Sequence, residues 1–185
     1  MICIFLDRDG VINHNKADYV RKIEEVTYIP GAFEGLARLA NAGLPTVIVS
    51  NQAGVGHGLI APEELERIDQ KILHDVSAHG GKITASYYCT HRKDASCDCR
   101  KPRTGLFEKA QMEIGANLSD SFFIGDAASD IEAGKKAGLR TILVLTGRTP
   151  YSEVEGWKIK PDHISVDLIG ASHWILDTVG CTNRP

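Results

Sequence analysis

Short apolar runs alternate with helical patterns along most of the chain, and this alternation restricts the possible fold more than any other feature. The runs span residues 2–6, 46–49, 83–89, 121–124, 141–145 and about 163–166. Each run is short enough for a buried parallel strand. Apolar residues at helical spacing separate most of these runs. The order of elements predicts one α/β domain, with a doubly wound, mostly parallel sheet and helices on both faces.

The predicted helices cover residues 33–40, 62–76, 106–114, 131–137 and 168–175. Glycines at positions 54, 56 and 58 predict a flexible loop after the second strand. Residues 1–176 form the expected domain, and residues 177–185 form a loose tail. No insertion after the first strand or near Lys101 is long enough for a separate cap domain, so we expect a site that is open or covered only by loops.

Composition excludes several classes of protein. The 185 residues carry a net charge of -3, with 43% hydrophobic and 24% charged residues, so the basic excess typical of nucleic-acid or membrane-surface binding is missing. The N-terminus has no basic segment leading into an apolar run, and no apolar stretch approaches the roughly 20 residues that span a bilayer. We therefore expect a cytoplasmic monomer without nucleic-acid or membrane partners.

Two carboxylates, one residue apart, follow the first apolar run. Asp7 and Asp9 come directly after residues 2–6, and Gly10 then lets the backbone turn. Side chains two positions apart on an extended segment share a face, so these acids repel each other unless a cation lies between them or one binds a proton. Both arrangements are useful for chemistry on phosphate. On this stretch alone, a solvated Asp pair in a surface turn is an equal alternative.

Polar residues also follow the later strands, and the carboxyl ends of such strands are where ligands bind in an open α/β sheet. Ser50, Lys101 and Asp126 occupy these positions. Asp7, Asp9 and Asp126 supply the hard oxygen ligands that Mg²⁺ prefers. Ser50 and Lys101 supply a hydroxyl donor and a positive charge for phosphate oxygens. The sequence predicts a cation, anion-binding groups and a nucleophile at one edge of the sheet.

A second metal site is indicated by four side chains within eleven residues: Cys89, His91, Cys97 and Cys99. Three thiolates and one imidazole are the ligand set of a closed structural zinc site. A redox pair is the alternative, but its usual C-x-x-C spacing is missing. Cys3 lies inside the first strand and Cys181 in the tail, so neither is an expected ligand.

Four short motifs, in order along the chain, resemble those of the haloacid dehalogenase (HAD) superfamily of phosphatases. They are Asp7-Arg8-Asp9-Gly10, Val49-Ser50-Asn51, Lys101-Pro102 and Gly125-Asp126-Ala127-Ala128-Ser129-Asp130. The resemblance spans most of the chain. It implies a Mg²⁺-dependent phosphomonoesterase with an aspartyl-phosphate intermediate, whose catalytic residues are Asp7, Asp9, Ser50 and Lys101.

Within that resemblance, Asp7 is the nucleophile that attacks phosphorus, and Asp9 protonates the leaving oxygen and then activates water. Mg²⁺ is held by Asp7, the backbone carbonyl of Asp9, and Asp126. Asp130 is either a ligand through water or the N-terminal acid of the next helix, and it stays outside the predicted magnesium shell.

The cysteine-rich segment runs directly into Arg100-Lys101-Pro102. This arrangement narrows the resemblance to a zinc-containing branch that acts on heptose 1,7-bisphosphate, at the 7-position, or on histidinol phosphate. Zinc would then hold the loop that presents Arg100 and Lys101. The residues expected to contact substrate are Ser50, Asn51, Gln52, Arg100 and Lys101. Ala127 departs from the heptose pattern, in which a lysine can follow the motif aspartate.

Three other functions are alternatives to the heptose phosphatase. Histidinol phosphate is the nearest alternative substrate. A polynucleotide phosphatase would need a basic groove and stacking aromatics, which a net charge of -3 and 6% aromatic residues do not favour. A non-catalytic zinc protein of the same fold is disfavoured by the complete set of catalytic residues. Tyr19 and His14, in the polar stretch after the nucleophile, are weaker candidates for substrate contact.

Overall fold

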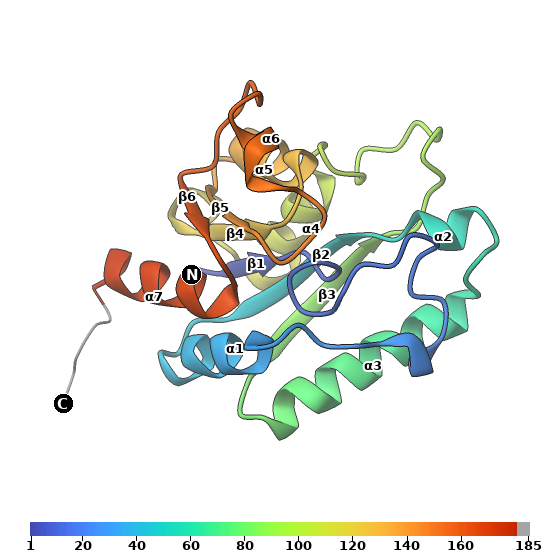
Figure 1. Cartoon of the computed structure of the whole chain (residues 1–185), viewed down its shortest axis with the longest axis horizontal. Coiled ribbons are helices and arrows are strands. Elements are labelled where there is room, and N and C mark those ends of the chain that lie inside the picture. Colours follow the sequence, from blue (N-terminus) through green and yellow to red (C-terminus); the bar gives the residue numbers. More distant parts are fainter. Residues whose placement is uncertain (181–185) are drawn as a thin grey trace.

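The computed structural model describes residues 1–180 and contains a six-stranded parallel sheet with the order β3-β2-β1-β4-β5-β6 (Figure 1). The strands are β1 (Ile4–Leu6), β2 (Thr46–Asn51), β3 (Ile83–Cys89), β4 (Phe122–Gly125), β5 (Arg140–Val144) and β6 (His163–Ser165). All neighbouring strands pair in parallel. The predicted α/β class and the predicted strands are confirmed.

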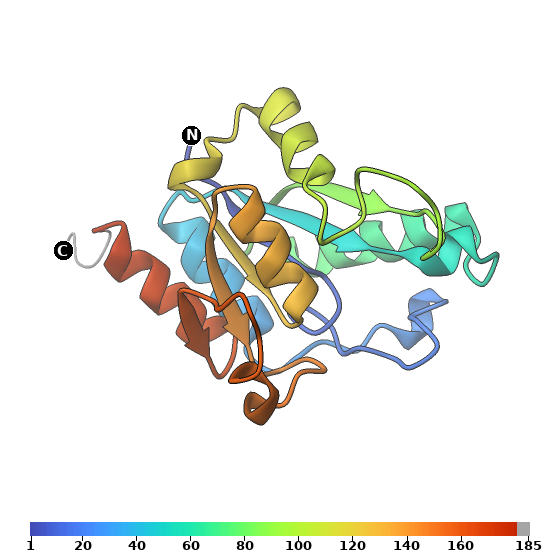
Figure 2. The same ribbon diagram turned by 90° about the horizontal axis from the view of Figure 1, so that it is seen from above.

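Helices cover both faces of this sheet. The longer ones are α1 (Ala32–Asn41), α3 (Pro62–Ala78), α4 (Gly105–Ile114), α5 (Ala128–Lys136) and α7 (Leu168–Thr178). The shorter ones are α2 (Ala53–Gly56), α6 (Tyr151–Val154) and the 3-10 turns η1 (Ile23–Glu25) and η2 (Leu118–Asp120). Helices α1, α3 and α7 lie on one face, whereas α4 and α5 lie on the other, which faces the viewer in Figure 2.

The central strand β1 shows why its sequence is a continuous apolar run. Ile4 and Leu6 belong to the core beneath α1, α3 and α7, whereas Phe5 belongs to the core beneath α4 and α5. The Phe5 ring meets Phe107 of α4 edge-on, with 5.3 Å between centroids. Side chains alternate between the two faces of a strand, so a strand buried on both sides needs apolar residues at every position.

The strand order places a crevice at the carboxyl end of β1. The chain proceeds from β1 to β2 and β3 in one direction and then crosses to β4 on the other side of β1. Loops leaving β1 and β4 therefore diverge to opposite faces of the sheet. Such a switch in direction creates a ligand-binding crevice. Asp7 and Asp126, which follow these two strands, lie at this position.

Tertiary contacts change the predicted end of the second strand and the loop that follows it. Strand β2 continues through Asn51, and the predicted flexible loop begins with helix α2. This helix packs closely on the segment after β3, since a Cβ atom on Gly56 would come within 2.5 Å of the Thr90 carbonyl oxygen. Helix α7 reaches Thr178, two residues beyond the domain boundary predicted at residue 176.

Residues 1–180 include no separate cap domain, because every segment belongs to the sheet, its helices or the connecting loops. Within this part of the chain, no helix combines the length and apolar character required to cross a membrane. Residues 181–185 of the predicted tail, Cys181 among them, lie outside the described residues.

Candidate active site

Lys101 connects the motifs at the base of the crevice. Its Nζ atom lies 3.1 Å from Asp7 Oδ1 and 2.7 Å from Asp130 Oδ1, and it donates to the Val49 carbonyl oxygen at 2.9 Å. Only 1% of the Lys101 side chain is exposed. Asn51 fixes the lysine backbone, accepting from its N–H at 3.0 Å and donating to its carbonyl oxygen at 3.2 Å. The structure brings Lys101 to the predicted nucleophile.

Asp130 orders the loop that carries Asp126. Its Oδ2 atom accepts from the backbone N–H groups of Asp126 and Ala127, both at 3.1 Å. Asp126 in turn accepts from the Arg148 backbone N–H at 3.0 Å and from Asn15 Nδ2 at 3.4 Å. Asp130 therefore acts as the acid of the first turn of α5 and as the partner of Lys101, and it also belongs to the carboxylate cluster.

Two glycines make room for the Asp126 carboxylate. A Cβ atom on Gly10 would come within 2.4 Å of Asp126 Oδ2, and one on Gly147 within 2.0 Å. Gly10 also has a φ of +88°, a left-handed conformation that favours glycine. The loops after β1 and β5 can therefore close on Asp126 only because both positions lack a side chain.

The acids at the crevice repel one another, and this fits a bound divalent cation. Carboxylate oxygens of Asp7, Asp126 and Asp130 lie within 4.8 Å of one another. Burial, opposed by Lys101, raises the pKa of Asp7 to about 6. Burial and the neighbouring Asp7 and Asp130 raise the pKa of Asp126 to about 7. A cluster of hard oxygen donors with excess negative charge suits Mg²⁺, whose charge would offset the burial and the mutual repulsion that raise these pKa values.

Asp9 has a different environment from Asp7. Arg8 donates to both of its carboxylate oxygens, at 3.0 Å each from Nη2, while Asn13 donates to Oδ1 at 2.7 Å and Gln52 to Oδ2 at 2.8 Å. Burial acts to raise the pKa of Asp9, but the Arg8 guanidinium and the Asn13 and Gln52 hydrogen bonds outweigh it and lower the pKa. The pKa values of the two acids of the first motif are therefore shifted in opposite directions.

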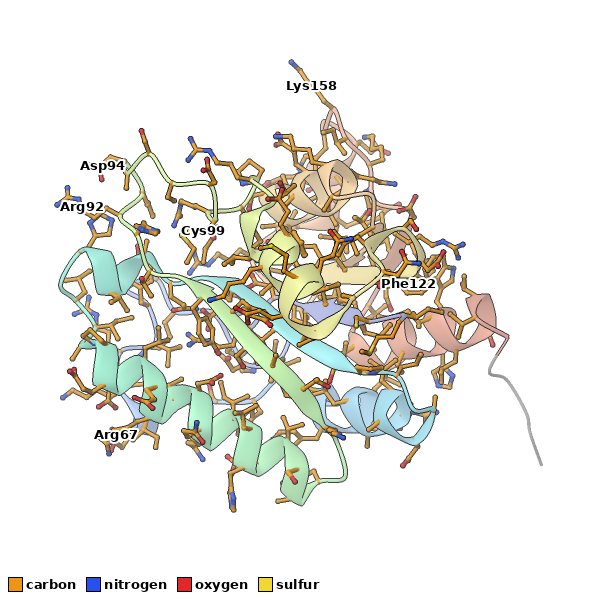
Figure 3. The ribbon with its side chains drawn as sticks, turned by 180° about the vertical axis from the view of Figure 1, so that it is seen from behind. Arg67, Arg92, Asp94, Cys99, Phe122 and Lys158 are labelled. Carbon is orange, nitrogen blue, oxygen red and sulfur yellow. The ribbon has the colours of Figure 1, made fainter. Side chains whose placement is uncertain are left out.

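The predicted zinc ligands meet in the segment after β3, which we call the cysteine loop (residues 89–99). Cys89 Sγ lies 3.8 Å from Cys97 Sγ and 3.6 Å from His91 Nδ1, and His91 Nδ1 lies 3.2 Å from Cys99 Sγ. Tetrahedral zinc with bonds of about 2.0–2.3 Å separates its ligand atoms by about 3.5–3.8 Å. The four side chains fit a zinc ion. Figure 3 shows Cys99 on the inner side of this loop, with Arg92 and Asp94 pointing outward.

A cavity of about 180 Å³ opens over the crevice. Its lining includes seven of the predicted site residues: Asp7, Asp9, Ser50, Asn51, Arg100, Lys101 and Asp126. Gln52, also a predicted substrate contact, does not line the cavity, because its side chain is fully buried behind Asp9. Tyr19 lines the cavity, whereas His14 does not.

Sequence reasoning missed three residues of the cavity: Asn15, Lys93 and Arg148. They lie in three separate loops, after β1, in the cysteine loop and after β5. None belongs to a recognisable motif. A polar residue close to a motif, such as Asn15 near Asp9, is the only signal that could have drawn attention to one of them.

A parallel sheet with an acidic nucleophile position, a buried lysine and an aspartate cluster at its switch point defines a HAD-like phosphatase. The sequence profile of the family described as HAD-hydrolase-like matches residues 98–171. The D-glycero-β-D-manno-heptose-1,7-bisphosphate 7-phosphatase of Pseudomonas aeruginosa is 36% identical over 145 residues, which cover 78% of this chain and 82% of that protein. The D-glycero-D-manno-heptose-1,7-bisphosphate 7-phosphatase of Chlorobaculum tepidum is 36% identical over 180 residues, covering 91% and 90%.

The crystal structure of D,D-heptose 1,7-bisphosphate phosphatase from B. bronchiseptica, complexed with magnesium and phosphate, has the same fold. It matches with a TM-score of 0.90 at 29% identity, and the match covers 96% of this chain and 99% of that one. The chain belongs to the D-glycero-D-manno-heptose-1,7-bisphosphate 7-phosphatase family of HAD-like phosphatases.

Proposed function

We propose that this protein is a Mg²⁺-dependent phosphatase that hydrolyses D-glycero-D-manno-heptose 1,7-bisphosphate at the 7-position. The observation that carries the proposal is the convergence of Asp7, Lys101 and Asp126 at the base of a cavity with a basic rim. The family relationship supports the same substrate. A magnesium and phosphate complex of a related enzyme supports the cofactor.

In the proposed reaction, an Asp7 carboxylate oxygen attacks phosphorus as the bond to the sugar oxygen breaks. The pKa of Asp9 is lowered in the unliganded site, so Asp9 would take up a proton as the negatively charged phosphate ester binds beside it, and it would then give that proton to the departing oxygen. Asp9 then takes a proton from water, whose oxygen attacks the phosphorus of the aspartyl phosphate, so that inorganic phosphate leaves and Asp7 is regenerated. Asp7, Asp126 and the backbone carbonyl of Asp9 would hold Mg²⁺. When bound, Mg²⁺ offsets the negative charge that the phosphate and carboxylates share.

Ser50 and Lys101 would bind the transferring phosphate. The Ser50 side chain is 99% buried at the end of β2, and Lys101 carries its charge at the nucleophile itself. Asn51, predicted as a substrate contact, holds the Lys101 backbone through both of its hydrogen bonds. We therefore assign Asn51 mainly to placing the lysine.

The basic rim suits a second phosphate. Lys93, Arg100 and Arg148 line the cavity in addition to Lys101. Arg100 Nη1 is buried, and no residue among positions 1–180 accepts a hydrogen bond from it. A guanidinium with an unused donor can bind a phosphate through two parallel hydrogen bonds, whereas the cationic amino group of histidinol would repel it.

Zinc in the cysteine loop would hold the segment that presents Arg100 and Lys101, and its ligands require reduced thiols. A reducing compartment such as the cytoplasm fits this requirement. We propose a monomer, because every residue assigned to the reaction comes from one chain.

Phosphate release tests the function. Wild-type protein with Mg²⁺ should hydrolyse both anomers of the heptose bisphosphate with a higher kcat/KM than histidinol phosphate, and the product should retain its 1-phosphate. Asp7→Asn should abolish release, because the nucleophilic oxygen is lost while the side-chain shape is kept. Near wild-type turnover in Asp7→Asn would remove Asp7 from the mechanism. A preference for histidinol phosphate would overturn the heptose assignment alone.

A further inference from the structure

Gln52 is fully buried, yet it contacts two residues of the proposed reaction. Its Nε2 group donates to Asp9 Oδ2 at 2.8 Å and lies 3.2 Å from Ser50 Oγ. Its Oε1 atom accepts from Arg8 Nη2 at 3.2 Å. One amide therefore connects the proposed acid with the proposed phosphate-binding hydroxyl and with a buried arginine.

Arg8 is also fully buried, and it donates to both carboxylate oxygens of Asp9. Its Nε and Nη2 atoms lie 3.2 and 3.0 Å from Asp9 Oδ1. The guanidinium carbon lies 5.9 Å from the centre of the Tyr88 ring, whose hydroxyl donates to Asp69 at 2.5 Å. A planar guanidinium backed by an anchored ring is restricted in rotation, so it holds the carboxylate in a defined plane.

These contacts leave the Asp9 carboxylate partly exposed. Asp9 keeps 20% of its side chain exposed and lines the cavity, whereas Arg8, Gln52 and Asn13 are fully buried. A buried ion pair is a weak source of stability, because apolar residues of similar volume often serve as well. Orientation of the Asp9 carboxylate toward the cavity explains the arrangement better than stability does.

We propose that Gln52 and Arg8 are positioning residues that fix the Asp9 carboxylate at the cavity for proton transfer to and from the substrate. This inference rests on the proposed phosphatase function. Proton transfer needs a donor within about 2.6–3.2 Å of its target, and a small misplacement can lower the rate about a hundred-fold. An unrestrained Asp9 side chain would occupy several rotamers, of which few meet this requirement.

The test uses Gln52→Met, which removes all three hydrogen bonds of the amide at similar volume, and Arg8→Lys, which keeps the charge but loses the planar fork. Gln70→Met, at an exposed position of α3, is the matched control. Thermal melts establish that each variant is folded. If Gln52→Met does not fold, Gln52→Asn, whose shorter amide cannot reach Asp9, replaces it.

Two substrates separate positioning from general damage. Turnover of the sugar phosphate needs a proton at the leaving oxygen, so kcat should fall about 10- to 100-fold with KM changed less than about three-fold. Under excess enzyme, release of 4-nitrophenolate from 4-nitrophenyl phosphate needs no proton and should stay within about two-fold of wild type. An equal loss with both substrates, or a loss confined to KM, would overturn the proposal.

A double-mutant cycle gives the second readout. In an Asp9→Asn background, Gln52→Met should change kcat less than about two-fold, because its target is already absent. The same fractional loss with and without Asp9 would show that Gln52 acts elsewhere, for example through Ser50. A wild-type protein that releases no phosphate from any of these esters would instead refute the proposed function itself.

Discussion

Lys101 and Asp130 form a buried ion pair, with Nζ 2.7 Å from Oδ1 and with 1% and 2% of the side chains exposed. Asp130 also accepts from the backbone after β4, and Lys101 also contacts Asp7. The pair therefore joins three motifs that are far apart in the sequence. Its removal should affect stability as well as catalysis.

Asp130→Asn should lower the free energy of unfolding by about 1.5–3 kcal/mol, because buried Lys101 loses its nearer charged partner while Asp7 stays 3.1 Å away. Urea unfolding at neutral pH measures this change. Glu132→Gln, which breaks an exposed i,i+4 pair with Lys136 on the same helix, is the control and should cost less than about 1 kcal/mol. Similar losses in the two variants would contradict the role of the buried pair.

Without Mg²⁺, the protein should lose stability as pH rises from 5 to 8. The pKa values of Asp7 and Asp126 are raised from 3.8 to about 6 and about 7 in the folded state, which therefore binds protons more tightly than the unfolded chain. The stability from these protons is present below about pH 4 and is lost as pH passes through the raised values. A loss of about 2 kcal/mol would lower Tm by roughly 4–8 °C.

Thermal melts in magnesium-free buffer, without a chelator that would remove zinc, measure this dependence. Added Mg²⁺ should raise Tm most at pH 8, where the carboxylates carry most charge. Asp126→Asn should flatten both the pH dependence and the Mg²⁺ effect. A Tm that increases between pH 5 and 8 in the metal-free wild type would be inconsistent with the raised pKa values.

The purified protein should contain about one zinc ion per chain. Cys99→Ser should reduce zinc content and lower Tm, since structural zinc contributes directly to folding. Cys3→Ala is the matched control: Cys3 is buried among the sheet residues, so its removal should lower Tm while zinc content stays at the wild-type level. Mass spectrometry measures the zinc content of each variant. A folded wild-type protein that contains no zinc would refute the predicted zinc site.

Arg100→Ala should lower kcat/KM for the heptose bisphosphate about ten- to a hundred-fold, because a charge-assisted contact of about 1.5–3 kcal/mol with the distal phosphate is lost. Histidinol phosphate lacks the distal phosphate, so its kcat/KM should fall much less. The ratio of kcat/KM between the heptose bisphosphate and histidinol phosphate should therefore decrease. Steady-state kinetics with both substrates measures this, with Arg38→Ala on α1 as the control. An unchanged preference would exclude Arg100 as a contact to the second phosphate.

The sheet, the helices on its faces and the position of the crevice could all be predicted from the sequence. These follow from local patterns: β1 is apolar at every position because both of its faces are buried, and α3 repeats Leu65, Ile68 and Ile72 at helical spacing. The spacing of Cys89 and Cys97 likewise brings the predicted zinc ligands together, because these four side chains are close in the sequence. The catalytic and binding roles remain predictions that the experiments above test.

Only the tertiary structure decided which polar groups contact one another. Gln52 was predicted to face the substrate, but the packing of β2 against the first motif turns its amide toward Asp9. Arg148 enters the site because Gly147 allows the loop after β5 to close on Asp126. Apolar periodicity can be read along the chain, whereas the partner of a buried donor comes from another segment: 43 residues separate Gln52 from Asp9, and 22 separate Arg148 from Asp126. Local sequence does not specify such pairs.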